Sequence, residues 1–297
     1  MLARRGPGVL EGRHDTDTDT DTDVLRFVDV GANDAFACAL DTEGQAHCWG
    51  YAYDEDYTPP EVRFMAIAVG GGHACGLQSD GTPACWGLDY QGSVSDTPDI
   101  ELTSISAGRH HACGLTPAGG LVCWGDNNQN LVAGHPTGTY ELVSCGETVC
   151  CVLDASGAPT CWGQQNGSSS DYGQVTDMPA GPFVNVAAGW RHACGMSADG
   201  SLECWGRNDY GQSEPPDARF QQVALATAHS CGVTTDAELR CWGYDRADDS
   251  DYGQVTDTPT TGSWLDVHPG VWFGCALDSE GQIECWGDNG MGQLDHP

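Results

Sequence analysis

Short apolar segments recur along this chain, and each is interrupted by glycine. In one stretch, an apolar segment from Phe183 to Ala188 ends at Gly189, and a second, from His192 to Met196, leads into Asp199-Gly200. An Asp-Gly pair between apolar segments is a strong signal for a β-hairpin. Residues 201–205 form the expected return strand. The pattern therefore predicts units of three or four short antiparallel strands joined by turns, without long helices.

The same unit occurs seven times, and the tripeptide Cys-Trp-Gly marks each copy. A period of 37 to 44 residues between the tryptophans is typical of repeat architectures. One such unit cannot bury both of its faces, whereas seven arranged radially can. Residues 24–30 match the opening of a repeat, and the last residues match its close. We therefore expect an all-β, closed seven-bladed β-propeller over residues 24–297, with the tryptophans packed between blades. These are Trp49, Trp86, Trp124, Trp162, Trp205, Trp242 and Trp286.

Most of the 16 cysteines fall into pairs ten positions apart within a repeat. In a hairpin centred on the Asp-Gly turn, the two cysteines lie opposite each other on one face, where a disulfide can span them. Zinc sites are the competing explanation, but they need closer cysteines or histidines at set spacing. We predict one hairpin disulfide per blade and an oxidising compartment. The pairs are Cys38–Cys48, Cys75–Cys85, Cys113–Cys123, Cys151–Cys161, Cys194–Cys204, Cys231–Cys241 and Cys275–Cys285.

The two remaining cysteines, Cys145 and Cys150, flank Gly-Glu-Thr-Val in the fourth repeat. An eighth, local disulfide is the favoured interpretation, and a reactive thiol pair is the alternative. The structural role is favoured because the sequence shows no basic or histidine neighbour that would lower a thiol pKa.

The charge balance is strongly acidic, with 11 Lys plus Arg against 43 Asp plus Glu and a net charge of -32. Such a polyanion repels phosphate backbones, which argues against nucleic-acid partners, and it favours solubility and cationic partners. No stretch approaches the roughly 18 apolar residues of a membrane-spanning helix. Residues 1–23 end in alternating Asp and Thr, and we expect this low-complexity acidic segment to be a disordered spacer.

The repeat Val-x-Ala-Gly-x-x-His-Ala-Cys-Gly-Leu-x-x-Asp-Gly-x-Leu-x-Cys-Trp-Gly-x-Asn-x-Tyr-Gly-Gln resembles the regulator of chromosome condensation repeat family over residues 24–297. The closing part of the motif is best preserved at Trp205 to Gln212 and at Trp286 to Gln293. The resemblance implies a seven-bladed β-propeller. The family's eukaryotic founder is a nuclear exchange factor for a small GTPase and binds chromatin, roles that the charge and the cysteine pairs fit badly. The disulfide-bearing repeats look like those of bacterial secreted or surface members, one of which inhibits β-lactamases through loops on one propeller face.

The loops after Cys-Trp-Gly vary most, and loops on a rigid scaffold commonly carry binding. The fourth and sixth repeats share Ser-Asp-Tyr-Gly-Gln-Val-Thr-Asp there. Its Asp and Tyr side chains suit a sugar, a basic protein surface or weakly bound Ca²⁺, although Tyr-Gly-Gln as a purely structural turn is the favoured alternative. Two further tryptophans at neighbouring turn positions are expected on one exposed face. The candidate binding residues are Tyr90, Asp171, Tyr172, Asp251, Tyr252, Trp190 and Trp272.

Histidines recur just before the first cysteine of several repeats, at His73, His111 and His192, with His229 in a variant setting. Equivalent imidazoles around a channel would bind a metal, but the other repeats carry Phe or Val there. A histidine that caps a backbone carbonyl is the favoured interpretation. No catalytic acid or nucleophile stands out from the repeat background, so we predict neither an enzyme nor a cofactor beyond weak Ca²⁺.

Together these features predict a secreted or surface-displayed protein–protein interaction module, located extracellularly or in the cell envelope. It would be a monomer that binds a protein partner through one loop face of the propeller. A carbohydrate-binding or polysaccharide-acting propeller, with a glycan as ligand, is the alternative. A GTPase exchange factor ranks low.

Overall fold

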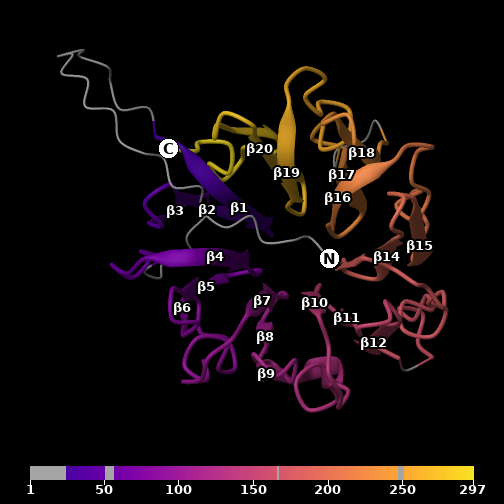
Figure 1. Ribbon diagram of the computed structural model, residues 1–297. Helices are drawn as coiled ribbons and strands as arrows, with labels where there is room; N and C mark the ends of the chain where they lie inside the picture. The colour runs from indigo at the N-terminus through magenta and orange to yellow at the C-terminus, as the bar shows by residue number, and fades with distance from the viewer. Residues whose placement is uncertain (1–24, 51–56, 166, 247–250) are drawn as a thin grey trace.

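Seven three-stranded antiparallel sheets surround a central channel in the computed structural model of the chain (Figure 1). The structure describes residues 25–50, 57–165, 167–246 and 251–297. The predicted acidic spacer, residues 1–23, lies outside the described residues. The prediction of an all-β, seven-bladed propeller is confirmed, and each blade has three strands.

Each blade is a meander of three consecutive strands that runs from the channel to the outer rim. The inner strands are β1 (Phe27–Asn33), β4 (Phe64–Val69), β7 (Ser104–Ala107), β10 (Leu142–Cys145), β13 (Asn185–Ala188), β16 (Phe220–Leu225) and β19 (Trp264–Pro269). The middle strands are β2 (Phe36–Asp41), β5 (His73–Gln78), β8 (His111–Leu115), β11 (Val149–Leu153), β14 (His192–Met196), β17 (His229–Thr234) and β20 (Phe273–Asp278). The outer strands are β3 (Ala46–Gly50), β6 (Pro83–Gly87), β9 (Leu121–Gly125), β12 (Pro159–Gly163), β15 (Leu202–Gly206), β18 (Leu239–Gly243) and β21 (Ile283–Gly287).

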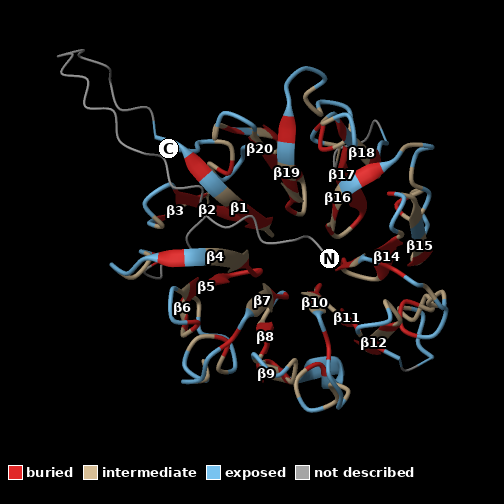
Figure 2. Cartoon of the chain, in the orientation of Figure 1, coloured by how far each residue is buried: buried red, intermediate tan, exposed pale blue. Residues whose placement is uncertain are grey.

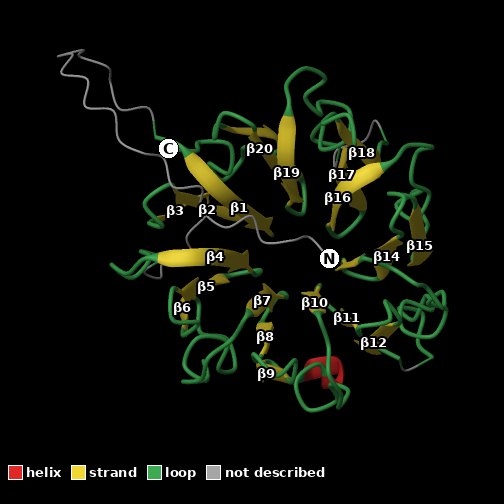
Figure 3. Ribbon diagram, in the orientation of Figure 1, coloured by secondary structure: helices red, strands yellow, loops and turns green. Residues whose placement is uncertain are grey.

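Loops make up most of the remaining described chain, and a 3-10 helix, η1 (Asn128–Asn130), lies in the loop after β9 (Figure 3). None of the helical segments in the described part of the chain is long and apolar enough to cross a bilayer.

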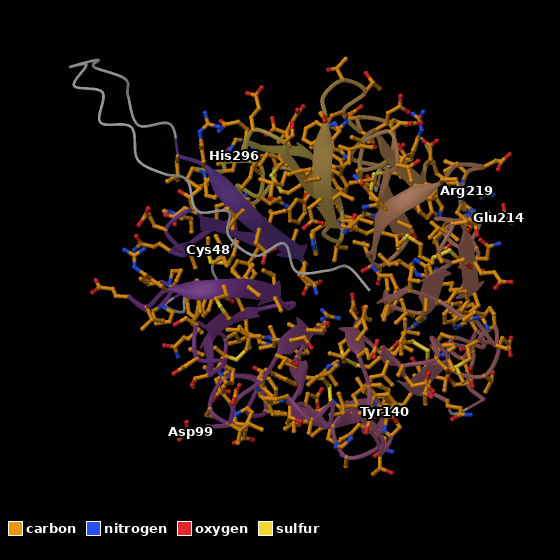
Figure 4. The ribbon with its side chains drawn as sticks, viewed as in Figure 1. Cys48, Asp99, Tyr140, Glu214, Arg219 and His296 are labelled. Carbon is orange, nitrogen blue, oxygen red and sulfur yellow. A yellow bond between two sulfur atoms is a disulfide. The ribbon has the colours of Figure 1, made fainter. Side chains whose placement is uncertain are left out.

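The hairpin between the middle and outer strands has the register expected from the Asp-Gly turn. In the fifth blade, Cys194 lies opposite Cys204 in the β14–β15 pair. All seven predicted hairpin disulfides form, so the prediction of one per blade is confirmed. Cys145 and Cys150 form an eighth bridge, and no cysteine is free in the described residues. Figure 4 draws the sulfur–sulfur bonds in yellow and labels Cys48 of the first blade.

The tryptophans of the Cys-Trp-Gly motifs form the core between blades, as predicted, because side chains alternate across a strand and leave tryptophan on the face away from the disulfide. All seven are buried. Trp86 packs with Phe36 and Leu40 of the preceding blade and stacks on Phe64 of its own blade, with ring centroids 5.3 Å apart. Each blade therefore completes the core of its neighbour.

The ring closes where the last blade meets the first. The backbone N–H of Phe27 donates to the carbonyl of Gly281 at 2.8 Å, and the Trp49 Nε1–H donates to the carbonyl of Gln293 at 2.9 Å. Phe27 and Phe273 also belong to one buried cluster. In Figure 1 the indigo first blade lies beside the yellow last blade. The expected closed ring is thus present.

Four inner strands carry an irregularity near their start, where one residue has no partner on the middle strand. The unpartnered residues are Val28, Met65, Gln221 and Leu265, in β1, β4, β16 and β19. Such β-bulges leave the extra side chain outside the ladder. The apolar ones, Val28, Met65 and Leu265, are 54 to 58% exposed. Figure 2 shows the resulting exposed band on β1, β4 and β19.

Candidate functional site

One end of the propeller is built from two kinds of segment, the turn between the inner and middle strands and the start of the loop after the outer strand. A recurring backbone hydrogen bond joins them, because the residue after Cys-Trp-Gly donates its N–H to a turn carbonyl. We call this end the loop face. The bonds run from Leu88 to Gly72, Asp126 to His110, Gln164 to Thr148, Arg207 to Arg191, Tyr244 to Ala228 and Asp288 to Trp272, at 2.7 to 2.9 Å.

An arginine lies between aromatic rings on the fifth blade of this face. The Arg191 guanidinium carbon is 3.7 Å from the centroid of the Trp190 ring and 5.9 Å from that of Tyr172. The Arg207 guanidinium carbon is 5.4 Å from the Trp190 centroid, 5.7 Å from Tyr172 and 5.0 Å from Tyr210. Arginine over an aromatic face within about 6 Å is a favourable cation–π contact. The two arginines hold the three rings in place.

The same arrangement continues across the sixth and seventh blades. Tyr210 contacts Tyr244 edge to face at 4.6 Å between centroids, and Tyr244 contacts Trp272 at 5.8 Å. Tyr252 lies 6.1 Å from Trp272, and Arg246 lies 4.8 Å from the Tyr210 centroid. We call this continuous set the aromatic–arginine strip. Its members are Tyr172, Trp190, Arg191, Arg207, Tyr210, Tyr244, Arg246, Tyr252 and Trp272.

Four of the seven candidate binding residues belong to the strip. Tyr172 and Trp190 lie at one end, and Tyr252 and Trp272 lie at the other. Tyr90 is on the same face but contacts His110, with ring centroids 4.5 Å apart. Trp190 and Trp272 were expected on an exposed face, and they are only partly exposed, because both are half-buried against their neighbours.

Sequence reasoning missed the residues that join the two ends of the strip, namely Arg191, Arg207, Tyr210, Tyr244 and Arg246. A signal for two of them was present. Arg207 and Tyr244 directly follow Cys-Trp-Gly, a position where the other repeats carry Tyr, Leu, Asp or Gln. The residue after Cys-Trp-Gly varies between repeats and lies on the loop face in each blade where the structure describes it. A comparison of this position across the repeats would have identified both residues.

The two candidate aspartates hold their own loops. The Asp171 carboxylate accepts the Gly173 N–H at 3.3 Å and the Gly167 N–H at 2.9 Å. Asp251 accepts the Gly253 N–H at 3.1 Å. These are local turn hydrogen bonds of the kind that Asp commonly makes. Both carboxylates therefore fix the loops that present Tyr172 and Tyr252.

The glutamine of the Tyr-Gly-Gln motif is the residue that ties each loop to the next blade. Gln174 is fully buried, and its Oε1 accepts the Tyr172 N–H at 2.7 Å. Its backbone carbonyl accepts the Trp205 Nε1–H at 3.1 Å. Gln212 and Gln254 repeat both contacts. The motif thus positions the tyrosines from a rigid interior, consistent with the structural turn favoured from the sequence.

A polar network crosses the mouth of the channel. Arg109 lies 3.6 Å from Asp34 and 3.4 Å from Glu147, and the Thr227 hydroxyl bonds Glu147 at 3.0 Å. Four blades meet here. Burial raises the pKa of Asp34, and burial together with the Asp34 charge raises the pKa of Glu147. The network joins the turns of the first, third, fourth and sixth blades.

A cavity of about 410 Å³ opens on the loop face beside Trp190 and Arg191. Arg109, Asp126 and Glu147 also line it. Its wall is therefore polar and charged, with one large aromatic side chain, which suits a hydrogen-bonding ligand rather than an apolar one.

The repeated histidines lie in the interior between blades. Burial lowers the pKa of His73 and His192 to about 3, and that of His111 and His229 to about 4. His192 Nε2 is 2.9 Å from the Ser230 hydroxyl of the next blade. The four imidazoles do not converge on one point among the described residues. His192 is thus tied to the next blade as a structural element, through a hydroxyl group rather than the backbone carbonyl expected from the sequence.

The expectation that Cys145 and Cys150 lack a histidine neighbour is wrong. His111 Nε2 lies 3.1 Å from the Cys150 sulfur, across the boundary between the third and fourth blades. The two residues are 39 positions apart, so local sequence could not show the contact. Blade-to-blade packing places it there.

The fold and the face define a seven-bladed, disulfide-bridged β-propeller with an arginine-rich aromatic strip at one end. Residues 102–130 and 183–212 match the family model of the Regulator of chromosome condensation (RCC1) repeat, which confirms the resemblance seen in the sequence. A search of curated proteins finds no match to the chain.

Solved structures with a similar fold include receptor ectodomains. The entire ectodomain of the receptor kinase CR4 from Physcomitrella patens has a TM-score of 0.72 at 26% identity, over 89% of this chain and 74% of that one. The CRINKLY WD40 ectodomain of the receptor kinase ACR4 from Arabidopsis thaliana has a TM-score of 0.70 at 24% identity, over 89% and 98%. Prp20p from Saccharomyces cerevisiae, described with its binding to Gsp1p and histones, has 0.62 at 18% identity, over 88% and 82%.

Proposed function

We propose that this chain is a secreted or surface-displayed interaction module that binds a protein partner through the aromatic–arginine strip. The observation that carries the proposal is the strip itself. Trp, Tyr and Arg are the residue types that dominate binding energy at protein interfaces. Here nine of them are contiguous on one face and are held by a rigid blade interior.

Preorganisation supports the same role. Trp190 and Trp272 are half-buried, and the buried Gln174 and Gln254 fix the tyrosine loops through backbone bonds. Side chains that are already ordered lose little conformational entropy on binding. A partner therefore gains contact area at a low ordering cost.

The compartment is inferred from the cysteines. Eight disulfides with no free thiol in the described residues are characteristic of proteins that fold in an oxidising environment. The similarity to the CR4 ectodomain, at 26% identity, is in keeping with an extracellular location. The net charge of -32 favours a partner with a basic surface, because opposite charges accelerate encounter.

The test is capture of a partner from native secreted or envelope material with three forms of the protein. They are the natural sequence, a strip variant combining Trp190→Ala with Trp272→Ala, and a control variant, Leu265→Ala. Leu265 is exposed at the opposite end of the inner strand. We expect a specific protein to be recovered with the natural and control forms and lost with the strip variant. Equal recovery with all three would rule out the strip as the binding site.

A glycan ligand is the alternative, and the polar cavity beside Trp190 is the observation that favours it. The ring of Trp190 lies beside carboxylates and an arginine, which together offer a stacking surface and hydrogen-bonding groups to a sugar. Soluble glycans added during the capture distinguish the two functions. Release of the captured material by a glycan would favour carbohydrate binding, whereas recovery of one protein in the presence of every glycan would favour a protein partner.

A further inference from the structure

The Cys145–Cys150 bridge departs from the repeat pattern. The two residues lie opposite each other in the β10–β11 pair. The equivalent pairs in the first and third blades are Ala32–Ala37 and Ala107–Ala112, and those blades form the same ladder. Strand pairing at this position therefore does not need a disulfide. The bridge is present at only one of the seven equivalent positions, so it calls for a chemical role rather than a role in strand pairing.

A buried imidazole accompanies the bridge. His111 Nε2 is 3.1 Å from the Cys150 sulfur, and both side chains are buried. In the fifth blade, the equivalent His192 instead contacts the hydroxyl of Ser230, which is equivalent to Cys150. His111 is thus aimed at a sulfur atom in the position where its counterpart is aimed at an oxygen.

The two cysteine residues are both buried but differ in exposure, at 7% for Cys145 and 0% for Cys150. Cys145 lines both the channel and a small cavity of about 40 Å³ at its mouth. Cys150 is fully buried behind it. A small thiol that enters the channel therefore meets Cys145, with Cys150 and His111 on the far side.

We propose that the Cys145–Cys150 bridge is selectively reducible and that its dithiol form, together with His111, binds a thiophilic divalent ion such as Zn²⁺. In the described residues, this is the one group of three or more potential ligand side chains whose ligand atoms all lie within 4.8 Å of one another, with the two sulfurs joined in the disulfide. Two thiolates and one imidazole form a familiar zinc ligand set, and the channel gives access for water at a fourth position.

The reduction needs a low-molecular-weight thiol as reductant. Its thiolate attacks the Cys145 sulfur, the sulfur–sulfur bond breaks, and the electron pair leaves on Cys150 as a thiolate. A second molecule of the thiol then releases Cys145, so that two thiols become one small disulfide and the protein gains two cysteine thiols. A stabilised leaving thiolate favours this exchange, and the Nε2–H tautomer of His111 is placed to donate a hydrogen bond to Cys150.

Metal binding follows from the same arrangement. The ion displaces the two thiol protons, and His111, with its own proton shifted to Nδ1, binds the ion through the Nε2 lone pair. The neutral form of an imidazole is the form that binds a metal. The bound metal would hold the two sulfur atoms apart and so block their reoxidation to the disulfide.

The test combines limited reduction with a cobalt titration of the folded full chain. Graded amounts of a small thiol, followed by alkylation and peptide mapping, should label Cys145 and Cys150 before any hairpin cysteine. Co²⁺ added to the protein at that stage should bind with one equivalent per chain and give a thiolate-to-cobalt charge-transfer band. A hairpin bridge reduced before or together with this one would overturn the selective-reduction half of the proposal.

The ligand role of His111 is tested with His111→Phe, and His192→Phe serves as the matched control. Phenylalanine already occupies the equivalent position at Phe36 and Phe273, so the fold accommodates it. We expect His111→Phe to weaken Co²⁺ binding by more than the roughly 10–100-fold that loss of an outer-shell partner costs, and His192→Phe to leave it unchanged. Unchanged binding in His111→Phe, or absence of the band in the reduced natural protein, would refute the metal site. Cys145→Ser combined with Cys150→Ser should give no band, and a band there would place the ion elsewhere.

Discussion

Replacing Trp49 by phenylalanine is expected to weaken the closure of the ring more than the same replacement of Trp124. The Trp49 Nε1–H donates to the Gln293 carbonyl at 2.9 Å, in a buried hydrogen bond that joins the first and last blades. Phenylalanine keeps part of the ring but not the donor. The buried carbonyl of Gln293 would lose this partner.

Trp124 supplies the matched reference. It is 4% exposed, against 8% for Trp49, and within the described chain its Nε1–H has no acceptor. Both substitutions remove a similar apolar area, so the loss of packing largely cancels in the comparison. What remains is one buried acceptor left without its bond in Trp49→Phe, which costs about 1–3 kcal/mol, and the removal of a buried donor without an acceptor in Trp124→Phe, which acts in the same direction. We therefore expect Trp49→Phe to reduce the free energy of unfolding by at least that much more than Trp124→Phe.

The assay is urea denaturation of both variants with all disulfides intact, followed by far-ultraviolet circular dichroism. The difference in midpoint, multiplied by the common slope, gives the difference in free energy. Equal midpoints would refute the reasoning, because the closing hydrogen bond would then contribute nothing. A less stable Trp124 variant would refute it as well.

Three further predictions concern the hairpin bridges, the loop glutamines and a carboxylate of the inner strand β1. Replacing Cys194 and Cys204 together by serine should lower the free energy of unfolding by about 2.7 kcal/mol in the chain-entropy model, measured by denaturant titration, whereas a change near zero would contradict that model. Gln212→Ala removes the buried acceptor of the Tyr210 N–H, which is bonded at 2.9 Å, and should lower the free energy of unfolding by about 1–3 kcal/mol. The Tyr210 amide should then exchange its hydrogen faster, and unchanged exchange would argue against this role. Burial, with the charge of Asp266 adding to it, raises the pKa of Asp29 from 3.8 to about 7, so the folded state binds this proton more tightly than the unfolded chain. The stabilising contribution of protonated Asp29 is therefore complete below the unfolded pKa and declines as the pH rises toward about 7. Asp29→Asn should flatten the fall in melting temperature over that pH range. An unaltered pH profile would count against the role of Asp29.

Much of the architecture could be read from the chain because each blade depends mainly on local pairing. The Asp-Gly turn sets the hairpin register, and that register alone brings Cys194 opposite Cys204. Seven copies of the unit and the alternation of side chains then place the tryptophans between blades. Four of the candidate binding residues could also be found, since Tyr172, Tyr252, Trp190 and Trp272 depart from the repeat pattern or lie in its variable loops.

The rest depended on contacts between blades. Tyr210 meets Tyr244, and Tyr244 meets Trp272, only because neighbouring blades present their loops and turns beside one another. His111 reaches Cys150 from 39 positions away, and Glu147 reaches Thr227 from 80. No local pattern contains such pairs, because they arise from the rotation that relates one blade to the next. The sequence by itself determined the repeating blade and its bridges, whereas the tertiary ring decided which side chains meet on the loop face and around the channel.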